Sequence, residues 1–249
     1  MNEYRLTFLD PTNITIPIII YNTLIEDCFH FGYIKNEQAN ISGFLNHLIP
    51  CLSDYREELH NNFLQSNEND EALTTKIEEN LYKIYFNKYD YCDDGVIPVP
   101  FRVNKEHLQD FLDIVDGKLF KYNMDFSTFV RSLLIEYASK RLNQREYFFY
   151  FRQMNKIKTA ITQNRLCHFY TNKEKNSFIP VSIEIVKNRE FNILVGINIE
   201  QETAYILPLH CIKRVVITEE SAKITREICD FIYDSFEEYC EEEERKENK

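Results

Sequence analysis

The stretch that decides the fold runs from Arg165 to Thr218 and reads RLCHFYTNKEKNSFIPVSIEIVKNREFNILVGINIEQETAYILPLHCIKRVVIT. Apolar and polar side chains alternate along Phe178–Val186 and again along Phe191–Asn198. A period of two places alternate side chains on opposite faces of a half-buried sheet, so both segments are predicted strands. Three more strands are predicted at Arg165–Thr171, Thr203–Leu209 and Ile212–Ile217. Polar, turn-like segments separate the strands, which predicts a small antiparallel barrel that is closed or nearly closed.

Three runs within this stretch resemble a WYL domain, a family of Sm/SH3-like barrels that bind nucleic acid or nucleotide-like ligands. The runs are Phe178–Pro180, Phe191–Gly196 and Leu207–Val215. The sequence departs from the family in two places. The triplet that names the family is Asn192-Ile193-Leu194 here, and the two arginines of the family's closing strand are replaced by Pro208 and Cys211. The resemblance implies a WYL-like β-barrel over residues 146–218.

Charge is distributed unevenly along the 249 residues, whose net charge is −11. Residues 147–218 carry ten Lys or Arg against five Asp or Glu, whereas residues 1–95 carry six against sixteen and residues 219–249 carry five against twelve. Local sign decides attraction to phosphate more than the total does. The predicted barrel is therefore the part of the chain that is suited to nucleic acid.

The composition is that of a folded protein, with 44% hydrophobic and 14% aromatic residues. The first residues show no basic and apolar leader, and the longest apolar run, Ile16–Tyr21, is too short to span a bilayer. The seven cysteines are never spaced as C-x-x-C. We expect a cytoplasmic protein with reduced thiols and no membrane partner.

A strand–helix–helix order occurs twice in the N-terminal half. Asn13–Ile20 is β-like and precedes two segments with helical spacing of apolar residues, the second of which is expected to end or kink at Pro50. Val99–Val103 precedes two more such segments, which Asn104 and Asp125 can cap. Both units resemble the ribbon-helix-helix motif of small bacterial DNA-binding proteins, which folds only as a pair. Two copies in one chain can pair with each other.

Together these patterns predict an α+β protein. Its N-terminal half is helical and ribbon-helix-helix-like, and its C-terminal half is a small antiparallel Sm/SH3-like barrel followed by a helix. The predicted divisions are 1–95 (first unit with extra helices), 96–145 (second unit), 146–218 (barrel) and 219–249 (C-terminal helix and acidic tail). Tyr147–Arg152 is aromatic and is read as a strand that leads to the barrel. The apolar stripe of Ser221–Cys240 must be buried, on the barrel or on another subunit of a homodimer.

The candidate binding residues combine positive charge with aromatic rings in and beside the predicted barrel. Single-stranded nucleic acid is held by a positive groove together with aromatic platforms on which bases stack. The predicted nucleic-acid-binding residues are Arg152, Lys156, Arg165, His168, Tyr170, Lys173, Lys187, Arg189, Tyr205, Lys213 and Arg214, with Lys175 in the same basic set. The competing interpretation is that the loop lysines only keep the surface soluble and that Tyr170 and Tyr205 belong to the core.

Three functions remain open. The whole arrangement is similar to the WYL-domain accessory proteins of type VI-D CRISPR systems, in which the WYL protein binds single-stranded RNA and enhances an RNA-cutting effector nuclease. That resemblance implies a non-enzymatic accessory protein that binds single-stranded RNA. The alternative is a transcription regulator that binds duplex DNA through the ribbon, where Thr15 and Arg102 are the matching residues, and senses a ligand through the barrel. The third is an interaction protein that uses its acidic surfaces and binds no nucleic acid.

Catalysis and metal binding have little support in the sequence. Neither a G-x-S-x-G nor an H-E-x-x-H motif occurs, and the five glycines form no phosphate-binding loop. Cys167-His168 and His210-Cys211 cannot supply four converging ligands, because adjacent residues of a strand point to opposite faces. We therefore expect no catalytic residues, no metal site and no cofactor.

Overall fold

The structure is a computed structural model that describes residues 12–66, 70–87, 95–119, 125–186, 190–198 and 200–247. Its chain divides into two compact units, residues 1–140 and residues 141–249. Mixed helix and sheet agree with the predicted α+β class. Among the described residues, none of the helices combines the length and the apolar character that crossing a bilayer requires.

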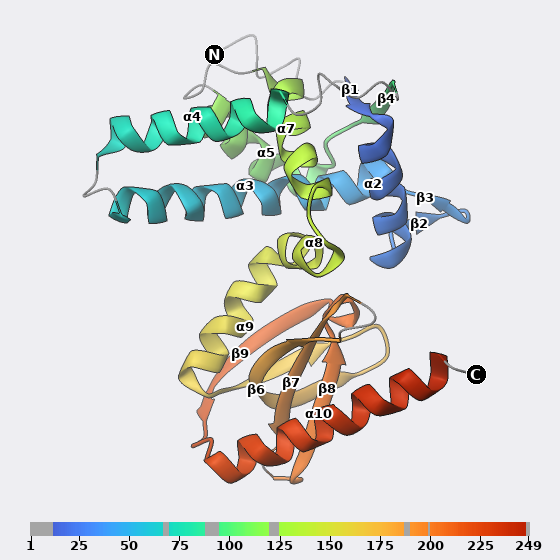
Figure 1. The fold of residues 1–249 in the computed structure, drawn as a ribbon, viewed down its shortest axis with the longest axis vertical. Helices are drawn as coiled ribbons and strands as arrows, with labels where there is room; N and C mark the ends of the chain where they lie inside the picture. The colour runs from blue at the N-terminus through green and yellow to red at the C-terminus, as the bar shows by residue number, and fades with distance from the viewer. Residues whose placement is uncertain are drawn as a thin grey trace. The chain divides into compact units, whose positions relative to one another are not determined.

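The first unit is built around a two-stranded antiparallel ribbon of β1 (Thr12–Pro17) and β4 (Val96–Phe101) (Figure 1). Ile14 lies opposite Val99 and Ile16 opposite Ile97, so these side chains share one face of the ribbon. Ile14, Ile16, Val99 and Phe101 are buried, whereas Asn13, Pro98 and Pro100 face outward. The ribbon therefore buries one apolar face and exposes the other.

Helices follow each strand of the ribbon. After β1 come α2 (Ile18–His30), a short hairpin of β2 (Ile34–Lys35) and β3 (Gln38–Ala39), α3 (Ile41–Ser66) and α4 (Glu71–Asn87). After β4 come a 3₁₀ turn (Lys105–His107), α5 (Leu108–Ile114), a π-helical turn (Val115–Leu119) and α7 (Phe126–Ala138). The strand–helix–helix order thus occurs twice, and the strands of the two copies pair within the chain.

The core of the first unit lies between α2, α3 and α7. Phe44 of α3 and Phe129 of α7 are fully buried, and the Tyr137 hydroxyl donates a 2.6 Å hydrogen bond to the buried Asp27. Of the two outcomes predicted at Pro50, the helix end does not occur, because α3 continues to Ser66 with Pro50 inside it. Every residue from 48 to 53 is buried, so packing around this turn offsets the roughly 3 kcal/mol that an internal proline costs.

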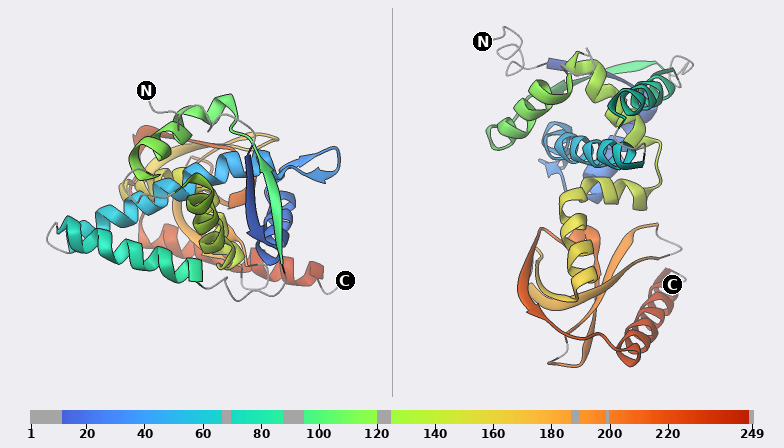
Figure 2. Two further views of the ribbon diagram at one scale, coloured as in Figure 1. Left: turned by 90° about the horizontal axis from the view of Figure 1, so that it is seen from above. Right: turned by 90° about the vertical axis from the view of Figure 1, so that its left-hand side faces the viewer.

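The second unit contains a five-stranded antiparallel sheet in the order β8-β7-β6-β5-β9. Its strands are β5 (Arg165–Tyr170), β6 (Lys175–Ile185), β7 (Asn192–Asn198), β8 (Thr203–Pro208) and β9 (Arg214–Ser221), and a 3₁₀ turn (Leu209–Cys211) joins the last two. The sheet is strongly curved (Figures 1 and 2). A closed barrel is not found in the described part of the chain, because β8 and β9 form the two edges and do not pair with each other.

Local irregularities help to produce this curvature. The register shifts between Pro180 and Ser182 on β6, and a second shift occurs near the start of β5. Bulges of this kind bend a strand and increase its twist. Gly196 of β7 lets β6 approach closely, because a methyl group at this position would overlap the Phe178 ring and the Ile179 carbonyl oxygen. The curvature therefore depends on packing that an alternating pattern does not encode.

Two helices precede the sheet and one follows it. The predicted strand at Tyr147–Arg152 is wrong, because these residues end α8 (Leu142–Phe149) and begin α9 (Phe151–Gln163). Their rings pack in these helices, where Phe148, Phe149 and Phe151 are buried. Burial against the rest of the unit outweighs the β-propensity of the aromatic run. Helix α9 then packs against β5, β6 and β9.

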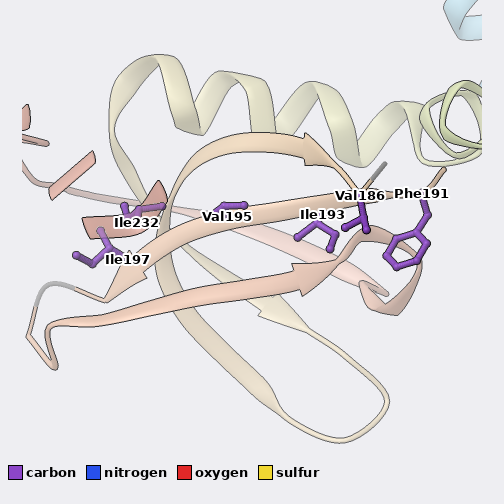
Figure 3. Packing of buried hydrophobic residues seen from close by; sticks show 6 residues of the cluster. All are labelled: Val186, Phe191, Ile193, Val195, Ile197 and Ile232. Carbon is purple, nitrogen blue, oxygen red and sulfur yellow. The ribbon is translucent and has the colours of Figure 1, made fainter. Parts of the chain in front are cut away.

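The predicted C-terminal helix is α10 (Arg226–Glu247), and it packs against β7 and β8. Figure 3 shows Ile193, Val195 and Ile197 along β7 in a cluster with Ile232 of α10, whose side chain is fully buried. Partly buried Ile228, Phe236 and Tyr239 join the same cluster. The sequence left two partners open for this apolar stripe, the barrel of the same chain or a second subunit. In the structure, the stripe packs against the sheet of its own chain.

Candidate nucleic-acid interface

Five residues of β5, β6 and β9 form a continuous patch, which we call the β5 surface: His168, Tyr170, Lys175, Ser177 and Arg214. Tyr170 lies directly opposite Lys175 on β6 and Arg214 on β9. Two residues earlier, His168 lies opposite Ser177 on β6 and Val216 on β9. Directly opposed residues of an antiparallel pair project from the same face. The patch therefore consists of two neighbouring rows that cross three strands.

The β5 surface lies on the outside of this part of the sheet. The intervening β5 residues, Cys167 and Phe169, are fully buried on the other face. Phe169 stacks on Phe178 with ring centroids 4.3 Å apart, which fixes the buried face as an aromatic layer. Lys175 and Arg214 are exposed, whereas His168 and Tyr170 are half-buried. Both charges and part of both rings are thus accessible to a ligand.

Direct contacts hold the β5 surface together. The Arg214 guanidinium lies over the Tyr170 ring, 5.7 Å from its centroid, a cation–π geometry. His168 Nδ1 and Ser177 Oγ are 3.0 Å apart, within hydrogen-bond distance. The Lys213 backbone N–H donates a 2.8 Å hydrogen bond to the Tyr170 carbonyl, so Lys213 is attached to the end of β5. The rings are therefore held in place before any ligand binds.

Two further lysines make the Tyr170 end of the sheet positive. Lys173 is exposed in the turn between β5 and β6, and Lys213 is exposed just before β9. The Lys213 backbone bonds to the Tyr170 carbonyl, and Lys173 lies in the turn that the 2.9 Å hydrogen bond from Thr171 to Glu174 closes directly after β5, so both lysines belong to this end. With Lys175 and Arg214, four cations lie at this end. Phosphate attraction is expected here.

A buried polar network positions the turn that leads into Lys213. Glu146 of α8 is fully buried and accepts hydrogen bonds from the Asn192 backbone N–H at 2.6 Å and from its Nδ2 at 2.9 Å. His210 Nδ1 lies 3.7 Å from Glu146 Oε1, and the Tyr150 hydroxyl donates a 3.1 Å hydrogen bond to the His210 carbonyl. These contacts connect α8, β7 and the 3₁₀ turn. They therefore fix the position of the chain just before β9.

The structure separates other predicted residues from this surface. Tyr205 stacks on Phe178 at 4.9 Å and belongs to the aromatic layer of the opposite face. Arg165 lies at the other end of β5, where its Nη1 donates to the Glu219 carbonyl. Arg152 and Lys156 are exposed and four residues apart on α9. Lys187 and Arg189 lie outside the described residues. The β5 surface thus brings together His168 and Tyr170 with Arg214, near Lys173 and Lys213.

The predicted binding set omitted Ser177. The alternating pattern placed the start of its strand at Phe178, which assigned Ser177 to a turn, whereas β6 begins at Lys175, three residues before Phe178. The sequence did hold a signal for this position. Ser177 is two residues before Ile179, so on an alternating strand both side chains project from the same face. Because His168 pairs with Ser177, the longer strand adds a hydroxyl group to the β5 surface.

An acidic helix limits the surface on one side. Ser177 and Ile179 are two apart on β6, and Ile179 lies opposite Ile197, so the β5 surface shares its face with the cluster under α10. Helix α10 carries ten Asp or Glu against three Lys or Arg. A polyanion on this face is therefore repelled from β7 and β8 and attracted to β5, β6 and β9.

The outer face of the β1–β4 ribbon offers much less to a phosphate. Thr15 lies opposite Pro98, and Asn13 lies opposite Pro100. The Arg102 side chain is exposed but lies beyond the end of β4. The Thr15 carbonyl already accepts a 2.8 Å hydrogen bond from Arg131. Two prolines therefore occupy positions at which a reading face needs polar side chains.

Two helix N-termini of the first unit, those of α3 and α7, are capped by side chains, whereas Pro17 at α2 and Asn104, which was predicted to cap, form no such side-chain hydrogen bond. The Asn40 side chain accepts a 3.1 Å hydrogen bond from the Gly43 N–H at the start of α3. At α7, Asp125 accepts from the Thr128 N–H at 2.9 Å. Burial by itself raises the pKa of Asp125, but the Thr128 hydrogen bonds outweigh it and hold that pKa below its usual value. The α7 N-terminus thus carries a negative charge, which opposes phosphate binding there.

Comparison with solved structures shows that the fold is shared with another protein. The chain is similar to a structure described as "Crystal structure of a CRISPR Cas-related protein", with a TM-score of 0.60, 20% identity and 88% of this chain covered. The match spans 65% of that longer chain. At this identity the similarity establishes the fold alone.

A second similar structure is the proteasome accessory factor B/C (PafBC) of Arthrobacter aurescens. Its TM-score of 0.29, with 11% identity over 53% of this chain and 24% of that chain, is too low to support an argument. No family model matches the chain, and no curated protein matches it.

Proposed function

We propose that this chain is a non-enzymatic accessory protein of a CRISPR system and that it binds single-stranded RNA through the β5 surface. The observation that carries the proposal is the row Arg214–Tyr170–Lys175, in which an aromatic ring lies between two cations on adjacent strands. Rings supply stacking that tolerates any base, and the cations hold the phosphate backbone. Binding and positioning account for the whole of this function, with no chemistry by the chain itself.

The fold supports the CRISPR part of the proposal. The solved structure that shares it over 88% of this chain is described as Cas-related. Along the chain, β5 and β9 are the first and last strands of the sheet, and they pair with each other, which fits a WYL-like domain of the Sm/SH3 type. The paired strand–helix–helix units fit a ribbon-helix-helix pair. We therefore propose an RNA-guided effector nuclease as the protein partner, in the cytoplasm.

Self-association is a separate part of the proposal. The main apolar stripe of α10 is used within the chain, but Phe231 and Tyr233 remain 43% and 46% exposed on its flanks. A homodimer through these flanks predicts twice the monomer mass in sedimentation equilibrium. The double variant F231S/Y233S then sediments as a monomer, whereas a wild-type monomer rejects the dimer and leaves RNA binding unaffected.

A titration against two nucleic acids tests the RNA proposal. Fluorescence anisotropy is measured with a labelled single-stranded RNA and with a duplex DNA of equal length, over a series of salt concentrations. Four cations that contact phosphates predict a slope of log K against log salt of about −3 for the single strand. Tighter binding of the RNA is expected because the rings need unpaired bases.

The same titration separates the alternatives. Preference for duplex DNA, with loss on Arg102→Glu, supports the transcription regulator that uses the ribbon and rejects our proposal. Failure to bind either nucleic acid at low salt supports the third possibility, an interaction protein that works through its acidic surfaces.

A further inference from the structure

The two rings of the β5 surface occupy alternate positions on one strand. His168 and Tyr170 project from the same face of β5, because Cys167 and Phe169 are buried on the other. Two strand residues span about 6.6 Å. This spacing is roughly twice the ~3.4 Å rise per nucleotide of a stacked strand. Two consecutive bases can each lie on their own ring only if the strand is unstacked and extended.

From this spacing we infer that His168 and Tyr170 are tandem platforms for two consecutive bases of an extended single strand. The inference deepens the proposed function and rests on it. Imidazole and phenol rings are both side chains on which unpaired bases stack. A duplex cannot bind in this way, because its bases stay stacked and paired. The tandem platforms therefore account for a single-strand preference without any reading of sequence.

The two rows differ in charge, and this difference orients the ligand. Tyr170 lies between Arg214 and Lys175, whereas His168 lies between Val216 and Ser177. The first row attracts phosphate, and the second offers an apolar side chain, a hydroxyl and an imidazole. We place the phosphate that joins the two nucleotides beside Arg214 and the second base over His168.

The contacts of each ring support separate roles. The Arg214 guanidinium is 5.7 Å from the Tyr170 centroid, close enough to contact the phosphate of a nucleotide whose base stacks there. Ser177 Oγ holds His168 at Nδ1 and leaves Nε2 outside that bond. Nε2 is then available to a base edge. Tyr170 is thus the platform beside the cations, and His168 is the platform that also offers a hydrogen-bonding ring nitrogen.

Helix α10 limits how far a bound strand can extend across this face of the sheet. Helix α10 with its ten acidic residues packs on β7 and β8 of the same face. The strand is therefore excluded from that side, and the footprint on the sheet stays close to two bases. Longer RNAs gain affinity only through the lysines at the Tyr170 end, Lys173 and Lys213.

The test uses the full chain and two single-stranded RNA octamers of equal charge, one complete and one with two adjacent abasic nucleotides. The complete RNA is expected to bind about tenfold or more tightly than the abasic RNA, since each of the two stacked bases contributes about fivefold or more. Y170L should lose part of this difference, and the double variant H168L/Y170L should bind both RNAs alike. Y170F should retain it, because the ring is kept, and Y21L on α2, where Tyr21 is half-buried as Tyr170 is, serves as the matched tyrosine control.

A spectroscopic signal reports the stacking directly. A 2-aminopurine in the octamer is quenched when it stacks, so wild type and Y21L should quench it, and Y170L and H168L should each remove part of the quenching. Circular dichroism confirms that both leucine variants are folded. If abasic and complete RNA bind wild type equally while charge reversal at Lys213 and Arg214 still weakens both, the platforms are rejected and the proposed function stands. If wild type binds no single-stranded RNA, the proposed function fails first.

Discussion

The ribbon of the first unit and the β5 surface of the second are both exposed faces of antiparallel strands, but their side chains differ. On the ribbon, Thr15 and Asn13 face Pro98 and Pro100. On the β5 surface, Tyr170 faces Lys175 and Arg214. The backbone geometry is of one type, so the difference lies in which residues occupy the outward positions. A strand pair becomes a phosphate-binding face only where cations and rings alternate with the buried side chains.

The two faces also differ in their rigidity and local charge. Side-chain contacts within the β5 surface hold His168 and Tyr170 before binding. Near the ribbon, several donors that a phosphate needs are already used, since the Gly43 and Thr128 N–H groups donate to Asn40 and Asp125, and Arg131 donates to the Thr15 carbonyl. The next three experiments address this contrast, from the largest expected effect to the smallest.

Charge reversal compares the two faces directly. K213E/R214E should weaken single-stranded RNA binding by about 100-fold, because two charge-assisted contacts of about 1.5 kcal/mol each are lost. R102E, an exposed arginine beside the ribbon, is the matched control and should change the affinity less than twofold. Anisotropy at low salt measures both. If both variants lose the same RNA affinity, the RNA contacts both units, and the ribbon and the β5 surface do not differ in function.

A glycine substitution tests the scaffold beneath the β5 surface. G196A should lower the free energy of unfolding by about 2 kcal/mol, because the added methyl overlaps the Phe178 ring and the Ile179 carbonyl. G117A, where the methyl meets nothing within 4 Å, should leave it unchanged or raise it slightly. Urea denaturation followed by circular dichroism measures the change. If G196A has the same free energy of unfolding as wild type, β6 and β7 can move apart without cost.

The smallest effect concerns the negative cap of α7. The folded-state pKa of Asp125 is lowered, so its contribution to stability is present above its ordinary pKa of 3.8 and is lost as the pH falls through the folded value. D125A should lose about 1 kcal/mol at pH 7, whereas D125N should keep the cap. Thermal melts between pH 2 and 7, roughly the range of carboxylate titration, should show a weaker acid dependence for D125N. The same acid dependence in D125N and wild type would mean that Asp125 does not act through its charge.

Much of the fold follows from local patterns in the sequence. The strands at Phe178–Val186 and Phe191–Asn198 were predicted because alternation reports a half-buried sheet, and β6 and β7 occupy these segments. Of the two predicted forms, closed or nearly closed, full closure does not occur, and bulges and edge pairing depend on contacts such as Gly196 against Phe178. The aromatic run at Tyr147 was misread because its rings are buried in helices. Tertiary contacts decided each of these cases.

The candidate site shows the same limit. Composition identified the basic and aromatic segment, and Tyr170, His168 and Arg214 are adjacent in the sheet. Tyr205 looked equivalent in the sequence, but the register between β7 and β8 places it opposite Gly196 and against Phe178. Which face a ring occupies depends on register and bulges, and a single residue of slippage reverses it.

The buried carboxylate of Glu146 has a practical consequence for isolating the second unit. A fragment that began at β5 would lack Glu146 and Tyr150, so the Asn192 amide would lose its acceptor and the His210 carbonyl would lose its donor. An unsatisfied buried amide costs about 1–3 kcal/mol. A truncated version intended for crystallisation or NMR should therefore start no later than Arg141, so that the whole of α8 is included.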